Sequence, residues 1–128
     1  MKKRMIVAAN WKMNKNLSEA IEFLEKLDFH IDENDSQSSV IIFPPFIGLE
    51  SLAGKFNSNN FYLGSQNFYY EESGAFTGEV SISMLEHIGI VYAIIGHSER
   101  RSLFYEKDNL INKKIRSCLA SSINPILC

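Results

Sequence analysis

The sequence predicts an α/β protein built on a parallel sheet, and two observations support this. Short apolar runs alternate along the chain with longer segments in which apolar residues recur at helical spacing. The runs are apolar throughout rather than alternately apolar and polar, as is typical of strands covered on both faces. Strict alternation of strands and helices favours parallel βα units. Periodicity leaves open whether the sheet is open or closes toward a barrel.

Five short runs are the predicted strands. The first is bounded by polar residues and is predicted to be a buried strand, and the second ends at two consecutive prolines. The fourth passes directly into a glycine and a set of titratable side chains, and the fifth only begins before the sequence stops. We expect these strands at residues 5–9, 40–43, 92–95 and 125–128, with the third opening at 61–63.

Four segments carry the spacing of amphipathic helices. Gly89 is expected to end the third helix, and Asp108 is expected to cap the fourth. Residues 32–39 are predicted to form a polar loop, and residues 68–79 a longer irregular segment. The four helices are expected at residues 17–27, 47–56, 80–88 and 108–119.

Composition and charge describe an ordinary globular protein. The 128 residues suit a single domain over residues 1–128, with 45% hydrophobic and 22% charged residues. The net charge of −2 offers no basic field for nucleic acid or for an anionic membrane. The apolar run near the N-terminus is too short for a signal peptide or a membrane span. Because Cys118 and Cys128 also lack metal-site spacing, we expect a cytoplasmic protein with reduced thiols.

Polar side chains follow two of the predicted strands. Asn10 and Lys12 come after the first strand, and His97 and Glu99 after the fourth. Because parallel strands end at the same edge of a sheet, these groups suit a small anionic substrate whose oxygen gains negative charge during reaction. Each residue alone has a simpler structural role, such as a turn asparagine, a solvated lysine, or an N-cap at Ser98. The sequence contains no GxGxxG, P-loop, HExxH or GxSxG motif.

Three short motifs resemble the triosephosphate isomerase family. They are Ala-Ala-Asn-Trp-Lys-Met-Asn at 8–14, Gly-Ala-Phe-Thr-Gly-Glu at 74–79 and Gly-His-Ser-Glu-Arg-Arg at 96–101. They occur in that family's order and spacing, and the similarity runs from residue 5 to residue 128. The resemblance implies a (β/α)8 TIM barrel, of which this chain holds about the first four βα units and the start of the fifth strand.

The resemblance also implies an activity. The family interconverts dihydroxyacetone phosphate and D-glyceraldehyde 3-phosphate through an enediolate in glycolysis and gluconeogenesis, as a homodimer and without cofactor or metal. By position, His97 would be the neutral electrophile that contacts the substrate oxygens, and Lys12 would bind the phosphate and stabilise the oxyanion. Asn10 would position Lys12 and bind substrate, while Ser98 and Glu99 would support the site.

The segment at 68–79 would be the family's interdigitating dimer loop. Its tip, Thr77, would reach the partner's active site, and Glu79 would pair with Arg100 across the interface. A plain surface loop is the alternative, but Phe76 and two tyrosines would be costly to expose. The residues expected at the dimer interface are Met13, Phe76, Thr77, Glu79 and Arg100.

The chain departs from the family's pattern in length. A (β/α)8 barrel takes about 250 residues, so we expect the glutamate base, the lid and the phosphate loops in a missing C-terminal half. Glu106 matches a supporting carboxylate rather than the base, and Tyr105 stands where many members have a small residue. The fragment alone is expected to be inactive, with two bare strand edges that favour association. A non-catalytic half-barrel that serves as an assembly or binding subunit is the alternative.

Overall fold

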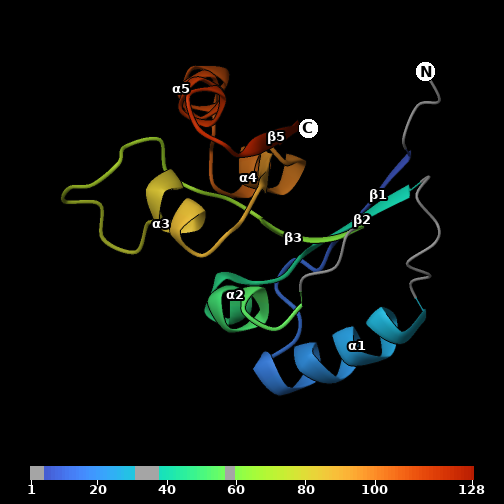
Figure 1. Cartoon of the computed structure of the whole chain (residues 1–128). Helices are drawn as coiled ribbons and strands as arrows, with labels where there is room; N and C mark the ends of the chain where they lie inside the picture. The colour runs from blue at the N-terminus through green and yellow to red at the C-terminus, as the bar shows by residue number, and fades with distance from the viewer. Residues whose placement is uncertain (1–4, 31–37, 57–59) are drawn as a thin grey trace. The chain divides into compact units, whose positions relative to one another are not determined.

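The computed structural model of the chain describes residues 5–30, 38–56 and 60–128 (Figure 1). It separates into two compact units, Met1–Gly64 and Ser65–Cys128. Most of the loop predicted at 32–39 lies outside the described residues. Within the described ranges, no helix is long and apolar enough to cross a membrane.

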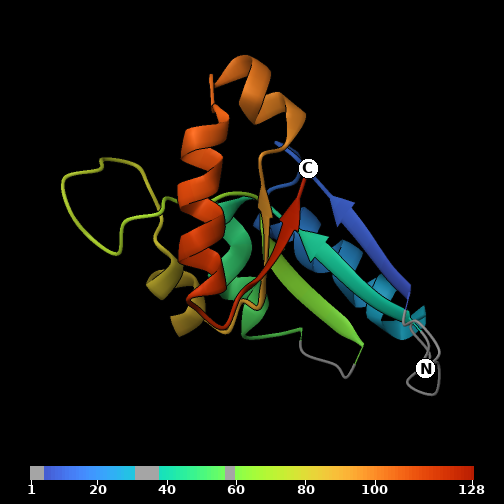
Figure 2. The ribbon, with the colours of Figure 1, turned by 90° about the horizontal axis from the view of Figure 1, so that it is seen from above.

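The first unit is a parallel arrangement of three strands with two helices. β1 pairs with β2, and β2 pairs with β3, each in parallel, as the sequence predicts. Both helices lie on one face of these strands, and they pack against each other (Figures 1 and 2). The elements are β1 (Met5–Asn10), α1 (Leu17–His30), β2 (Ser38–Phe43), α2 (Phe46–Ala53) and β3 (Phe61–Ser65), whose last residue opens the second unit.

Local sequence accounts for the start of α1 and for the close packing of β3. A reciprocal capping box begins the helix, because Asn16 Oδ1 accepts from the Glu19 N–H at 3.0 Å and Glu19 Oε2 accepts from the Asn16 N–H at 2.9 Å. A Cβ at Gly64 would lie 2.2 Å from the ring of Phe43, so only glycine fits there. The core side chains of this unit include Leu24, Ile41, Phe43, Leu49, Leu52, Phe61 and Leu63.

The prediction that the first strand is buried is wrong. Met5, Ile6 and Val7 of β1 are 61%, 53% and 49% exposed, whereas Ile41 of the neighbouring β2 is fully buried. The two runs are similarly apolar, but among the described residues β1 pairs with β2 alone, while β2 has a strand on each side. Burial is therefore decided by neighbours and not by composition.

The second unit holds two parallel strands and three helices. β4 pairs with β5 in parallel, with Ile94 opposite Ile126, and α5 packs against both strands. The expected core strand is confirmed, because Ala93 and Ile95 of β4 are buried. The elements are α3 (Ile82–His87), β4 (Tyr92–Ile95), α4 (Ser98–Leu103), α5 (Asp108–Leu119) and β5 (Asn124–Leu127).

Gly89 ends α3, as predicted. It adopts φ +80°, and its N–H donates to the carbonyl of Glu86 at 2.9 Å while the N–H of Ile90 donates to the carbonyl of Leu85 at 3.0 Å. This pair of bonds is the Schellman arrangement, in which a left-handed residue satisfies the last carbonyls of a helix. Glycine adopts that conformation without steric cost.

The expected cap at Asp108 is wrong. Asp108 is the first residue of α5, Lys107 precedes it as the capping residue, and no side chain caps the helix. The Asp108 carboxylate instead accepts from Arg101 Nη1 at 2.8 Å. Arg101 lies seven residues earlier, in the last turn of the short helix α4.

Candidate active site

Asn10 and Lys12 form a single turn at the end of β1. The side-chain oxygen of Asn10 accepts from the backbone N–H of Lys12 at 2.9 Å, and Lys12 adopts φ +57°. The left-handed region is costly for a residue with a Cβ, by about 1 kcal/mol. Trp11 extends the strand ladder by donating its N–H to the Phe43 carbonyl at 3.1 Å. The turn therefore holds an exposed lysine in a strained conformation directly after a strand.

The loop after this turn is held by its own side chains. Asn14 Nδ2 donates to the Trp11 carbonyl at 2.7 Å. The ring of Trp11 meets the ring of Phe23 edge-on at 5.4 Å, and the Lys15 ammonium lies 5.0 Å from the centroid of Phe23. Met13, in contrast, is 96% exposed at the tip of the loop. The loop thus presents one large apolar side chain to solvent.

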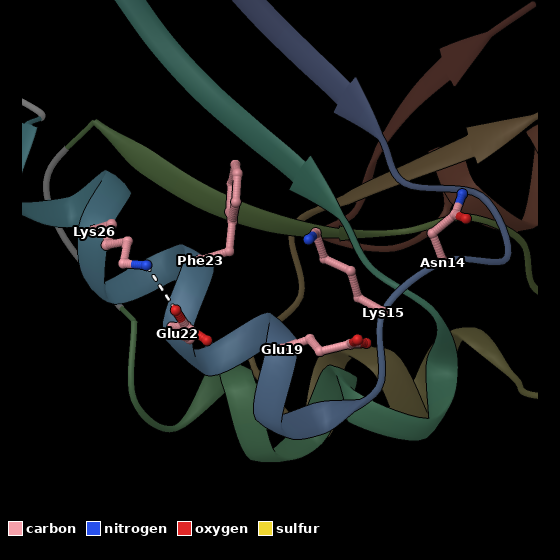
Figure 3. Close-up of a pocket in the computed structure, with 6 residues that line it drawn as sticks. All are labelled: Asn14, Lys15, Glu19, Glu22, Phe23 and Lys26. Atoms are coloured by element: carbon pink, nitrogen blue, oxygen red, sulfur yellow. Dashed lines mark hydrogen bonds and ion pairs between the residues drawn. The ribbon is translucent and has the colours of Figure 1, made fainter.

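A hollow of about 480 Å³ lies between this loop and α1 (Figure 3). Its charged groups are already engaged: Lys26 pairs with Glu22 at 2.6 Å, and Glu19 belongs to the capping box. Neither Asn10 nor Lys12 lines it. The hollow is therefore lined by the loop and α1 and does not include the candidate site residues. Its lining residues are Asn14, Lys15, Glu19, Glu22, Phe23 and Lys26.

His97 is the capping residue of α4 in the second unit. Its Nδ1 accepts from the backbone N–H of Glu99 at 3.2 Å. Glu99 Oε2 also lies 3.5 Å from Nδ1, but that contact is longer and would need a proton on Nδ1. We favour the backbone bond, because an N–H can only donate. Nδ1 is then unprotonated, and the proton of the neutral ring lies on Nε2, which becomes a hydrogen-bond donor.

The turn before α4 depends on a glycine. Gly96 adopts φ +72°, and a Cβ there would lie 3.0 Å from Arg101 Nη2 and 3.2 Å from Ile111 Cδ1. Arg101 Nε also donates to the Gly96 carbonyl at 2.7 Å, which closes the turn. Ser98, considered as a cap from the sequence, is instead an exposed first residue of the helix, because His97 holds the capping position.

A buried ionic cluster joins residues of α4 and α5 to the segment between them and to Asn67. Glu106 Oε1 accepts from Arg100 Nε at 2.7 Å and from Lys114 Nζ at 2.5 Å, and Lys114 Nζ donates to Asn67 Oδ1 at 2.7 Å. The side chains of Glu106 and Lys114 are 3% and 2% exposed. Within the described residues, Glu106 Oε2 has no hydrogen-bond partner. The cluster ties α5 to the residues that precede the 68–79 segment.

Burial and pairing act on these pKa values in opposite directions. Burial by itself would raise the pKa of Glu106, but the hydrogen bonds and charges of Lys114 and Arg100 outweigh it, and the pKa is lowered. Burial lowers the pKa of Lys114, and Glu106 only partly offsets that effect. Glu106 is therefore a carboxylate held ionised by its partners.

Sequence reasoning missed Lys114 and Asn67. A signal for Lys114 was present, because it lies three residues after Ile111 and four before Cys118, on the buried stripe of α5. A charged residue in such a stripe needs a buried partner. Arg100, expected to pair with Glu79 of another subunit, is bonded here to Glu106.

The 68–79 segment closes on itself. The N–H of Tyr69 donates to the Val80 carbonyl at 2.8 Å, and the rings of Tyr69 and Phe76 lie 4.6 Å apart. Phe76 is still 38% exposed, and Thr77 and Glu79 are exposed. Among the described residues, no group of three or more His, Cys, Asp or Glu side chains is placed to hold a metal ion.

Comparison with known proteins gives one family. The family model described as "Triosephosphate isomerase" matches residues 5–128. The chain is 44% identical over 126 residues to the triosephosphate isomerase of Caldanaerobacter subterraneus subsp. tengcongensis, 49% over 126 residues to that of Finegoldia magna, and 46% over 125 residues to that of Aquifex aeolicus. Each comparison covers 98% of this chain but only 50%, 49% and 50% of the relative. The chain spans about half the length of the curated relatives it matches.

Proposed function

The chain belongs to the triosephosphate isomerase family, and from that premise we propose that it supplies the electrophilic part of an isomerase site. The substrates would be dihydroxyacetone phosphate and D-glyceraldehyde 3-phosphate, interconverted in the cytoplasm as a step of glycolysis and gluconeogenesis. Family membership confirms the predicted fold class, the first part of a (β/α)8 TIM barrel, and parallel pairing within each unit agrees with it.

The observation that carries the proposal is the hydrogen bond at His97. Because Nδ1 accepts from the backbone, the neutral ring offers Nε2–H to a substrate oxygen. Removing a proton next to a carbonyl leaves negative charge on the carbonyl oxygen, and a placed donor stabilises that charge. The donor is needed on both substrate oxygens in turn, since the double bond of the enediolate joins the two carbons that bear them.

Lys12 supplies the positive charge in this proposal. The Asn10 side chain accepts from the backbone N–H of Lys12, so the side chain that carries the ammonium extends from a fixed backbone at the end of β1. In a (β/α)8 barrel, catalytic groups gather where the strands end, and His97 likewise follows the end of β4. We assign Lys12 to the substrate phosphate and the developing oxyanion, Asn10 to holding it, and Ser98 and Glu99 to supporting the site.

No general base is assigned within the 128 residues. The buried carboxylate of Glu106 accepts hydrogen bonds from Arg100 and Lys114, which stabilise its ionised form. We therefore do not assign it as the base. We propose that the base comes from the part of the family's barrel that this chain does not span.

A homodimer completes the proposal. Met13 is 96% exposed and Phe76 38% exposed, so both offer apolar area to a second copy. Thr77 and Glu79 are exposed on the same segment as Phe76, and we assign these four residues, with Arg100, to the subunit interface.

The test is reconstitution of the enzyme from two halves. The chain would be mixed with the C-terminal half of the Aquifex aeolicus relative, and isomerisation followed by a coupled assay. We expect activity from the mixture that is lost by His97→Gln, with Asn14→Ala as a control in the loop outside the catalytic set. A complex that forms without activity would favour the non-catalytic half-barrel instead.

A further inference from the structure

The peptide groups on both sides of His97 are held by one residue, Arg101. The Nε of Arg101 donates to the Gly96 carbonyl at 2.7 Å, and its backbone N–H donates to the His97 carbonyl at 3.1 Å. These two carbonyls belong to the peptide planes that flank the Cα of His97. Because the backbone has only two free dihedral angles per residue, holding both planes fixes the direction of the Cα–Cβ bond that carries the imidazole.

The other two nitrogens of the guanidinium fasten it to α5 and β5. Nη1 donates at 2.8 Å to Asp108, the first residue of α5, and Nη2 donates at 3.2 Å to the main-chain oxygen of Cys128. The N–H of Cys128 in turn donates to the carbonyl of Ile95 in β4 at 3.0 Å. Both strands point toward α4 in Figure 2. One planar group therefore connects the turn at His97 to the end of β5 and to the start of α5.

The glycine before His97 leaves room for the guanidinium. Gly96 is buried, and a Cβ there would lie 3.0 Å from Arg101 Nη2 and 3.4 Å from the main-chain oxygen of Cys128. A lysine would not reproduce the arrangement, because its ammonium is a point charge, whereas a guanidinium offers five N–H donors in a fixed plane. The geometry of the turn therefore requires an arginine and a glycine together.

The imidazole depends on this turn for its hydrogen bond. His97 Nδ1 accepts from the Glu99 N–H at 3.2 Å, and either nitrogen of a neutral imidazole can carry the proton. We propose that Arg101 is the positioning residue of His97, which keeps Nδ1 on the Glu99 N–H and thereby keeps the proton on Nε2. This inference rests on the proposed function, in which the Nε2–H contacts the substrate, and it adds the residue that holds this donor in place.

NMR of the full chain with ¹⁵N-labelled histidines tests the proposal at about pH 8, where a histidine of ordinary pKa is neutral. His97→Gln identifies the signals of this ring. In the wild-type chain, Nδ1 should give the signal of a bare nitrogen and Nε2 that of a protonated one. In Arg101→Lys and in Arg101→Gln, the two signals should move toward each other, because the ring no longer keeps one tautomer. Deuterium exchange of the Glu99 amide should accelerate by about tenfold as its hydrogen bond is lost.

Two control variants separate positioning from general stability. Asp108→Asn keeps an oxygen acceptor and removes only the charge of a largely exposed ion pair, so the His97 signals should not move. Arg116→Lys should not move them either, because Arg116 Nε donates to Asn112 within α5. The amide of Ile90, which donates to the Leu85 carbonyl, reports on the rest of the unit. Equal acceleration of the Ile90 and Glu99 amides in the Arg101 variants would mean that Arg101 only stabilises the unit, and would overturn the proposal.

The inference and the proposed function can fail separately. If the Arg101 variants are folded by circular dichroism and keep the wild-type His97 signals and Glu99 exchange, Arg101 does not position His97. The role of His97 itself is judged by the activity of His97→Gln after reconstitution. Unchanged NMR signals with an inactive His97→Gln would therefore remove the role of Arg101 and leave the isomerase assignment. Displaced signals with a fully active His97→Gln would support the hold of Arg101 on the ring and overturn the assignment of His97 as the electrophile.

Discussion

At the residue scale, the turn from Asn10 to Lys12 shows how a site residue is placed. The left-handed conformation of Lys12 is unfavourable by itself, and one side-chain hydrogen bond from its own loop selects it. The backbone conformation from which the Lys12 side chain extends is therefore held by the side chain of Asn10.

This makes the Asn10 side chain testable. Asn10→Ala removes the bond to the Lys12 N–H, and we expect the activity of the reconstituted enzyme to fall by about tenfold or more, because a displaced charge stabilises the transition state less well. The measurement is kcat/KM at constant pH. Asn14→Ala serves as the matched control, since it removes a hydrogen bond from the same loop. Equal losses in the two variants would mean that loop order alone matters.

Glu106 gives a second prediction, on stability. Glu106→Gln leaves Lys114 buried without a counter-charge, so we expect the free energy of unfolding to fall by about 3 kcal/mol. Urea unfolding at pH 7, followed by circular dichroism, measures it. Glu86→Gln is the control, because the Glu86 carboxylate accepts from Ser122 at the surface. The free energy of unfolding should fall much less in this variant than in Glu106→Gln.

The pH dependence follows from the same carboxylate. Its pKa in the folded chain lies below the ordinary value of 4.5, so its contribution to stability is complete above about pH 4.5 and is lost as the pH falls through the folded value. Protonation of Glu106 is coupled to unfolding in the wild-type chain but not in Glu106→Gln. The wild-type chain should therefore lose more stability than the variant between about pH 6 and pH 3. Equal losses would show that the cluster does not control acid stability.

At the scale of elements, β1 and β2 show that the position of a strand can be predicted without its burial. The sequence placed β1, β2 and β4 to within two residues, because apolar runs ended by turn residues are local signals. Composition alone could not show that β1 would be exposed, since that depends on which strands lie beside it.

The exposed edge leads to a prediction about association. Val7→Lys places a charge on β1, and we expect it to reduce aggregation without unfolding the chain, as charges do on natural edge strands. Light scattering and circular dichroism at increasing concentration measure the two effects. Val40→Lys is the matched control, because Val40 is the register partner of Val7 but lies between two strands. It should unfold the first unit, and an identical effect of both changes would contradict the edge interpretation.

At the scale of the whole molecule, the electrophile and the base of the proposed reaction are separable. General base catalysis is worth about 10²–10⁴ in rate, and the buried carboxylate of Glu106 is held by Arg100 and Lys114. We therefore expect the 128-residue chain alone to show no isomerisation above background in the coupled assay. Turnover that survives repeated purification and disappears in His97→Gln would contradict this and place a base within the chain.

The sequence by itself determined the order of the parallel βα units and the identity of Asn10, Lys12 and His97 as site candidates. These features depend on spacing, turn chemistry and short motifs, all of which are local in the chain. Only the tertiary structure decided the exposure of β1 and the hydrogen bond between the Glu99 N–H and His97 Nδ1. It also decided the bond between Lys114 and Asn67, which lie 47 residues apart. Such features depend on which groups meet in space, and a local pattern does not encode that.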